Sequence, residues 1–103
     1  MGYMENIKEH TSAAALYEQL AEEMAEATKA SQKVARILRG ESPTPVSLDE
    51  AISALREEIS DIVTVVSVIN YANDDPIKLY GSAAKIKRWS ERINHADLNG
   101  EQS

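Results

Sequence analysis

Two long stretches of apolar residues at helical spacing constrain the fold of this chain more than any other feature. In each stretch the apolar residues recur every three or four positions, which places them on one face of an α-helix. They are Leu16, Leu20, Met24, Ala27, Val34 and Leu38, joined by Ser31, and then Leu48, Ile52, Leu55, Ile59, Ile62, Val66 and Ile69. The pattern predicts an all-α protein.

Glycine, proline and capping residues mark where the first two predicted helices end and begin. The first helix is expected over residues 11–39, with Gly40 as its C-terminal stop. The segment 40–46 contains two prolines and therefore forms a connector without regular structure. Ser47 and Glu50 then fit a capping box, so the second helix begins here.

The second helix is expected to reach about Ala72. Its β-branched run over residues 62–69 also suits a strand on local propensity. We favour a helix, because the 3.6-residue period continues through the run without a breaker. Beyond it, Asp75 is expected to cap a third helix, with Pro76 in the first position and an end near Ala96.

The length of the chain, 103 residues, predicts a single domain. Its core is expected over about residues 11–96, with residues 1–10 and 97–103 at the periphery. A short connector makes the first two helices antiparallel neighbours, and so we expect an antiparallel helical bundle of three main helices. The second helix is apolar nearly all round over residues 62–69, more than two partner helices can cover. We therefore expect oligomerisation, as a homodimer or homotetramer, to complete the bundle.

Composition excludes several classes of function. The chain has no cysteine, which rules out disulfides, thiolate metal sites and a cysteine nucleophile. Its net charge of −6 argues against a nucleic-acid partner, and its longest apolar run is too short to span a membrane. The N-terminal residues lack the pattern of a secretory signal, so we expect a cytoplasmic protein without a membrane partner.

Two acidic clusters, at residues 22–26 and 57–61, interrupt the apolar pattern. At about 100° per residue, each cluster places one acid within or near the apolar stripe and another beside it, displaced in the same sense. These four acids are Glu23, Glu26, Glu58 and Asp61. Glu22 instead falls on the opposite, solvated side of the first helix.

Antiparallel packing of the two helices brings both acidic pairs to one side and to the same height within about one turn. Four converging carboxylates repel one another unless a cation lies between them. Oxygen ligands alone suit Mg²⁺, or Mn²⁺, better than zinc. The alternative is that these residues are ordinary solvated acids of an acidic protein.

The two acidic motifs, in this order, resemble those of the MazG-like nucleotide pyrophosphohydrolases, which belong to the all-α nucleoside triphosphate pyrophosphatase superfamily. The motifs are Glu23-x-x-Glu26 and Glu58-x-x-Asp61. The stretch 55–66 is similar to the family's Glu-Glu-Leu-x-Asp-Val pattern, and the resemblance covers roughly residues 15–93. The 31 residues between the two motifs make a somewhat longer gap than is usual in this family.

This resemblance implies Mg²⁺-dependent hydrolysis of a nucleoside or deoxynucleoside triphosphate to the monophosphate and pyrophosphate. The metal ligands it implies are Glu23, Glu26, Glu58 and Asp61, while the carboxylate that activates water stays undetermined. The basic segment of the third helix also looks like that of the family. It implies phosphate binding by Lys85, Arg88 and Arg92, which otherwise form a solvated basic face.

Two other functions remain open at the level of sequence. A phosphoribosyl-ATP pyrophosphohydrolase-like activity fits less well, because the segment that begins at Ser60 departs from the pattern of those enzymes. A non-enzymatic helical oligomerisation or protein-interaction module would use the apolar surface alone. Thermal melting with and without Mg²⁺ or Mn²⁺ separates the enzyme from the module, because only a metal site predicts stabilisation by the metal.

Overall fold

A computed structural model describes residues 2–41, 45–73, 76–79 and 81–100, the last four through their backbone. Within these residues the chain forms four helices and no strand, which confirms the predicted all-α class. The helices are α1 (Tyr3–His10), α2 (Ala13–Leu38), α3 (Leu48–Ala72) and α4 (Ala83–Gly100).

Local capping interactions explain both ends of α2. The hydroxyl of Ser12 accepts a hydrogen bond from the Ala15 N–H at 3.1 Å, and this satisfies one of the free donors of the first turn. At the other end Gly40 has a φ of +72°, a conformation that residues with a side chain rarely adopt. Its N–H donates to the Ile37 carbonyl at 3.0 Å. The predicted glycine stop is confirmed.

The β-branched run predicted as helix is indeed part of α3. The helix starts after Ser47, whose hydroxyl accepts from the Glu50 N–H at 3.1 Å, one of the two bonds of the predicted capping box. Within the run, the hydroxyls of Thr64 and Ser67 donate to carbonyls one turn earlier at 2.8 Å. Asn73 ends the helix, with both its backbone N–H and its side chain donating to the Ile69 carbonyl.

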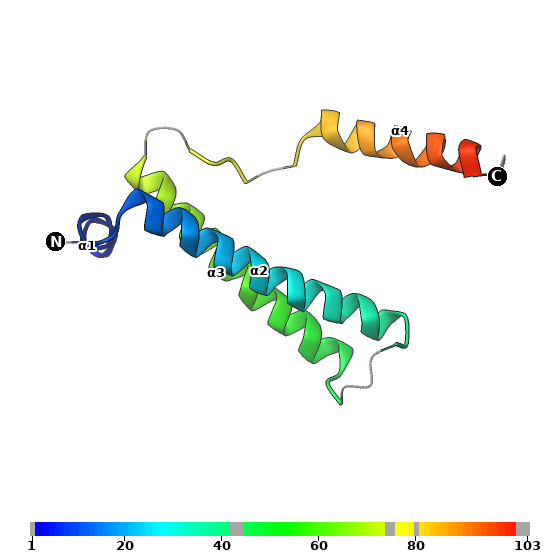
Figure 1. Ribbon diagram of the computed structural model, residues 1–103, viewed down its shortest axis with the longest axis horizontal. Coiled ribbons are helices and arrows are strands. Elements are labelled where there is room, and N and C mark those ends of the chain that lie inside the picture. Colours follow the sequence, from blue (N-terminus) through cyan, green and yellow to red (C-terminus); the bar gives the residue numbers. More distant parts are fainter. Residues whose placement is uncertain (1, 42–44, 74–75, 80, 101–103) are drawn as a thin grey trace.

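Helices α2 and α3 lie side by side as an antiparallel hairpin, and α1 packs against α3 (Figure 1). The buried apolar cluster consists of Leu16, Val68 and Ile69. Around it pack the partly buried side chains of Met4, Leu20, Val65, Ala72 and Ile77. The core therefore sits where the beginning of α2, the end of α3 and α1 meet, away from the connector.

The predicted start of the third helix is wrong. Asp75 lies outside the described residues, and Pro76 begins a stretch without regular structure, so that α4 starts only at Ala83. The cause is a tertiary contact. The Asn70 side-chain amide accepts from the Ile77 N–H at 2.7 Å and donates to the Ile77 carbonyl at 3.1 Å. These two hydrogen bonds anchor Ile77 to the end of α3, where its backbone is not helical.

Helix α4 extends beyond the predicted end at Ala96 and, within the part of the chain that the structure describes, packs against no other helix (Figure 1). The radius of gyration is 18.6 Å and the principal dimensions are 61 × 39 × 20 Å. A compact domain of this length has a radius of gyration of about 13 Å. The three-helix bundle expected from sequence is thus not formed within one chain, which instead has a two-helix hairpin, a short helix against it and a separate fourth helix.

Among the described residues, no helix combines the length and the apolar character needed to cross a membrane.

Candidate metal centre

Three of the four predicted ligands come together in the middle of the hairpin. Glu23 belongs to α2, whereas Glu58 and Asp61 lie one turn apart on α3. One carboxylate oxygen from each of the three lies within 4.8 Å of the others. Glu23 and Glu58 are half-buried and Asp61 is exposed, so the cluster opens to solvent on one side.

The fourth predicted ligand, Glu26, is not part of this group. Its carboxylate is exposed and lies 3.5 Å from the Lys29 ammonium, one turn further along α2. An ion pair between two exposed side chains is weak, and little free energy holds Glu26 in this position. Glu26 nevertheless remains close enough to affect the titration of Glu58.

The pKa of Glu58 is raised above that of an ordinary glutamate. Partial desolvation of the carboxyl group is the largest cause, followed by repulsion from Asp61, Glu26, Glu23 and Glu57. Both effects disfavour the charged form of the side chain. No cation among the described residues offsets this repulsion at Glu58 itself. The cluster therefore has an excess of negative charge, which a bound cation would neutralise.

A glutamine that the sequence reasoning overlooked orients one of the acids. Gln19 donates a hydrogen bond from Nε2 to Oε1 of Glu23 at 2.7 Å, from one turn earlier on α2. Glutamine and an acid four residues apart on a helix commonly pair in this way, so this spacing was the available signal. The bond fixes one oxygen of Glu23 and leaves the other free for a ligand.

A small cavity of about 310 Å³ adjoins the acids on the side of the core. Gln19 belongs to its wall and also hydrogen-bonds Glu23 of the acidic cluster, and Thr64 follows Asp61 by one turn of α3. The rest of the wall is mostly apolar and comes from α1, α2 and α3: Ile7, Thr11, Ala15, Leu16, Val65 and Val68. An uncharged pocket beside a carboxylate cluster offers separate places for an apolar group and a cation-bound group of one ligand.

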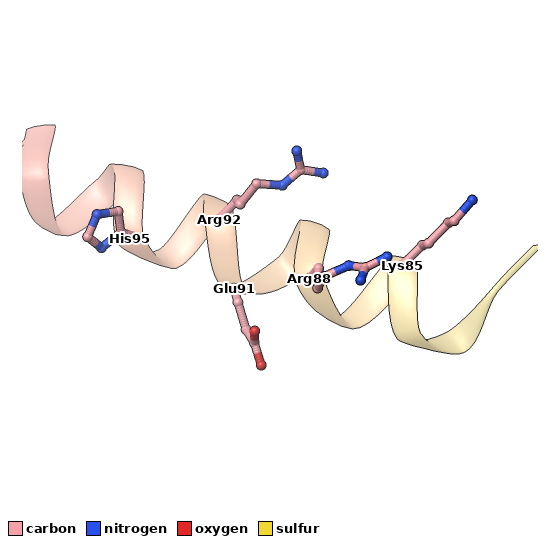
Figure 2. A pocket seen from close by; sticks show the side chains of 5 residues that line it. All are labelled: Lys85, Arg88, Glu91, Arg92 and His95. Carbon is pink, nitrogen blue, oxygen red and sulfur yellow. The ribbon is translucent and has the colours of Figure 1, made fainter.

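The predicted phosphate-binding residues lie on α4, away from the acids. Lys85 and Arg92 extend from the same side of this helix, with Arg88 between them along the axis, while Glu91 points away (Figure 2). Among the described residues, none of these three cations forms an ion pair with an acid. Within the described part of α4, Lys87 and Glu91 form an ion pair at 3.9 Å. A single chain does not bring the basic stripe to the acidic cluster.

The apolar run over residues 62–69, predicted as a subunit interface, is divided between the inside and the outside of the chain. Val66, Val68 and Ile69 are buried within the chain itself, and Val63 is largely exposed. On the side of the hairpin opposite to the acids, residues of α2 and α3 line a surface groove of about 520 Å³. Its lining is uncharged: Met24, Ala27, Thr28, Ser31, Gln32, Leu55, Ile59 and Ile62.

Comparisons with protein families, with curated proteins and with solved structures found no match to this chain.

Proposed function

We propose that this protein is a Mg²⁺-dependent nucleoside triphosphate pyrophosphohydrolase, with Mn²⁺ as a possible substitute metal. The observation that carries the proposal is the convergence of Glu23, Glu58 and Asp61 from two helices to within 4.8 Å. The order and spacing of these acids also resemble the motifs of the MazG-like enzymes. The substrate is a nucleoside or deoxynucleoside triphosphate, and the products are the monophosphate and pyrophosphate.

The donor set fits a hard divalent cation. All three side chains offer carboxylate oxygens, the ligands that Mg²⁺ prefers. Partial desolvation, followed by repulsion from the neighbouring carboxylates, raises the pKa of Glu58, and a bound cation would oppose both effects. Glu26 is placed to join them, because only an exposed ion pair with Lys29 holds it outside the group. When bound, Mg²⁺ supplies charge neutralisation for the phosphate oxygens.

The remaining steps belong to the protein side chains. A carboxylate of the cluster that is not bound to the metal accepts a proton from water as the water oxygen bonds to the α-phosphorus. The bond from that phosphorus to the bridging oxygen breaks, and pyrophosphate leaves. The pocket beside Gln19 holds the apolar part of the nucleotide, and Lys85, Arg88 and Arg92 compensate the charge of the outer phosphates.

Pyrophosphate release from a panel of ribo- and deoxyribonucleoside triphosphates tests the proposal. We expect release that requires Mg²⁺ or Mn²⁺ and stops when EDTA removes the metal. Detection of pyrophosphate rather than inorganic phosphate separates this reaction from ordinary triphosphatase activity. If no nucleotide of the panel is cleaved in the presence of either metal, the proposal is wrong.

The second candidate is a non-enzymatic helical interaction module, favoured by the exposed apolar residues and by the unpartnered α4. Thermal melting separates the two functions. A metal that binds only the folded state stabilises it, by about 2.7 kcal/mol when the metal concentration is a hundred times the dissociation constant. We expect such an increase with Mg²⁺ and none in the Asp61→Asn variant. A module without a metal site melts at the same temperature under both conditions once ionic strength is matched.

A further inference from the structure

Helix α4 has an exposed apolar side and, among the described residues, contacts no other helix of its own chain. Ile86, Trp89 and Ile93 are 61%, 64% and 51% exposed, and the helical period places them within one narrow stripe. Lys85, Arg92 and Arg88 follow Trp89 around the helix and form a basic stripe along one edge of the apolar one. An amphipathic helix of this kind is stable in water only when its apolar stripe is covered.

The charges of the chain are divided between its two parts. Residues 1–72 contain twelve acids and six basic residues, whereas residues 76–96 contain one acid and five basic residues. The acids of the first part include the cluster of Glu23, Glu58 and Asp61. The hairpin and α4 are therefore complementary in charge, although they do not meet within one chain.

Beside the acids, the hairpin has a surface on which such a helix can dock, and we call this surface the seat. Toward the connector, Ala30, Val34 and Ala54 continue the same side of the hairpin that bears the acidic cluster. Ala30 and Val34 are partly exposed and Ala54 is exposed. Because alanine side chains are short, a third helix can approach α2 and α3 closely at this place.

The segment that begins at Ile77 and includes α4 forms an arm. Asn70 holds Ile77 against the end of α3 through two hydrogen bonds, and Ile77 also packs on the core. From this anchor the chain leads away from the hairpin, and α4 lies apart from α2 and α3 (Figure 1). The anchor is a property of each chain, so the arm leaves every copy at the same place.

We propose that α4 of one copy docks on the acid-bearing side of the α2–α3 hairpin of a second copy, and that the exchange is reciprocal. This inference rests on the proposed function for the role of the site, because it places Arg88 and Arg92 of one chain at the phosphates held by the acids of the other. Each active site then consists of acids from one chain and cations from its partner.

A reciprocal exchange covers the apolar stripe of α4 in both chains with one kind of interface. Two-fold symmetry places the same arm on the same seat twice, so no apolar stripe of α4 stays in water. A helix of 18 residues is about 27 Å long and about 10 Å wide. Two such contacts bury roughly 1,000 Å² when both surfaces are counted, near the lower limit for a specific protein interface. Contacts between the two hairpins add to this area.

Trp89 provides a direct test, because it is the only tryptophan of the chain and lies on the stripe that docks. We expect its fluorescence emission to shift to shorter wavelength as the protein concentration rises from nanomolar to high micromolar. Size-exclusion chromatography with light scattering should show a dimer over the same range. Emission at long wavelength from a dimer contradicts the proposal, and so does emission at short wavelength that is independent of concentration, because α4 then docks within its own chain.

Two alanine variants test the position of the seat. Ala54→Arg places a bulky cation where α4 docks, and the concentration-dependent shift of Trp89 should be lost or moved to much higher concentration. Ala25→Arg is the matched control, since it makes the same change on the outer, exposed side of α2. Equal effects of both variants would show that the seat is placed wrongly.

Mixing two inactive variants tests the shared active site. Asp61→Asn damages the acids, and the double variant Arg88→Ala/Arg92→Ala damages the arm. When equal amounts of the two variants are unfolded together in urea and refolded, half of the dimers formed are heterodimers. Each heterodimer has one intact site. We therefore expect about a quarter of the wild-type activity from the mixture.

The outcomes separate this inference from the proposed function. If the wild type is active and the mixture stays inactive, the arm acts within its own chain and the inference is wrong, whereas the proposed function stands. If the wild type cleaves no nucleotide while the Trp89 shift depends on concentration and on Ala54, the exchange stands and the proposed function is wrong.

Discussion

At the scale of single residues, the environment of Glu58 has the clearest physical consequence. Desolvation and the nearby carboxylates of Asp61, Glu26 and Glu23 raise its pKa in the folded protein. The folded state without metal therefore holds the Glu58 proton more tightly than the unfolded state does. Ionising this side chain opposes folding, and a bound cation reverses the effect.

Without metal, the contribution of Glu58 to stability should fall as the pH rises from the ordinary glutamate pKa through its raised folded value. Over this interval the folded state binds more protons than the unfolded state, so the free energy of unfolding decreases with pH. Glu58→Gln removes this contribution, and the variant should gain stability over the wild type toward neutral pH. Urea unfolding with EDTA, measured from acid to neutral pH, checks the difference.

Glu22→Gln is the control for this pH dependence, because Glu22 is exposed and is not among the carboxylates that raise the pKa of Glu58. If the free energy of unfolding changed with pH in the same way for the wild type and Glu58→Gln, the expected raised pKa of Glu58 would be contradicted.

The chemistry of the site predicts a contrast between Asp61 and Glu22, which belong to the two acidic clusters of the sequence. Asp61→Asn keeps the size of the side chain but removes one charge from the three-carboxylate group. Activity should fall by about 10- to 100-fold or more, since changes even outside the ligand shell of a metal cost about 10- to 100-fold. Folding should survive, because the change relieves repulsion between carboxylates. Steady-state kinetics and circular dichroism measure the two effects.

Glu22→Gln is the matched control, because Glu22 is exposed and belongs to the acidic motif without belonging to the three-carboxylate group. Its activity should stay close to that of the wild type. Equal losses in both variants would mean that the assignment of the helical faces is wrong, and full activity in Asp61→Asn would mean that the enzyme hypothesis is wrong.

At the scale of elements, Asn70 determines how the chain leaves the hairpin. Its amide is the partner of both backbone groups of Ile77, which delays the start of α4 until Ala83. The sequence rule that proline favours the first turn of a helix is correct as a tendency. It fails at Pro76 because a side chain six residues earlier binds the backbone of the next residue, a contact between segments that local patterns do not contain.

Replacing Asn70 by alanine should therefore destabilise the end of the hairpin. Two partly buried hydrogen bonds are lost, at about 1 kcal/mol each. Urea unfolding should show a decrease of about 1–3 kcal/mol. Asn70→Asp keeps the acceptor for the Ile77 N–H and loses the donor, so its decrease should be smaller if the added charge remains solvated. No change in Asn70→Ala would mean that the contact does not hold the arm in solution.

At the scale of the whole molecule, the chain buries few of its apolar residues. Only Leu16, Ala51, Val66, Val68 and Ile69 are buried among the described residues. Large apolar side chains such as Met24, Ile59 and Trp89 are about half exposed or more. A helical protein of this length normally hides more of its apolar surface than this, and the elongated shape has the same origin.

Stability should consequently depend on protein concentration. When association covers surface that one chain leaves in water, mass action stabilises the folded state as the concentration rises. We expect the melting temperature to increase over a concentration series, while light scattering shows a dimer or tetramer at the upper end. A melting temperature that stays constant, together with a monomer at every concentration, would show that one chain folds alone.

The sequence by itself determined the helices of the hairpin and the faces on which their acids lie. Periodicity, the glycine stop and the serine cap are local properties, and each is fixed by residues within a turn or two. The convergence of Glu23, Glu58 and Asp61 followed from the same periodicity, because a short connector leaves antiparallel packing as the simplest arrangement of two such helices.

Tertiary structure alone decided where α4 begins and what α4 touches. The position of Glu26 instead follows from a local spacing, because Glu26 and Lys29 are three residues apart on one helix and form an exposed ion pair. The start of α4 depends on Asn70 reaching across the end of α3. The predicted bundle required α4 to pack on its own hairpin. Periodicity predicts which face of a helix is apolar, but it does not predict which surface covers that face. The covering surface depends on contacts between distant parts of a chain, or between chains.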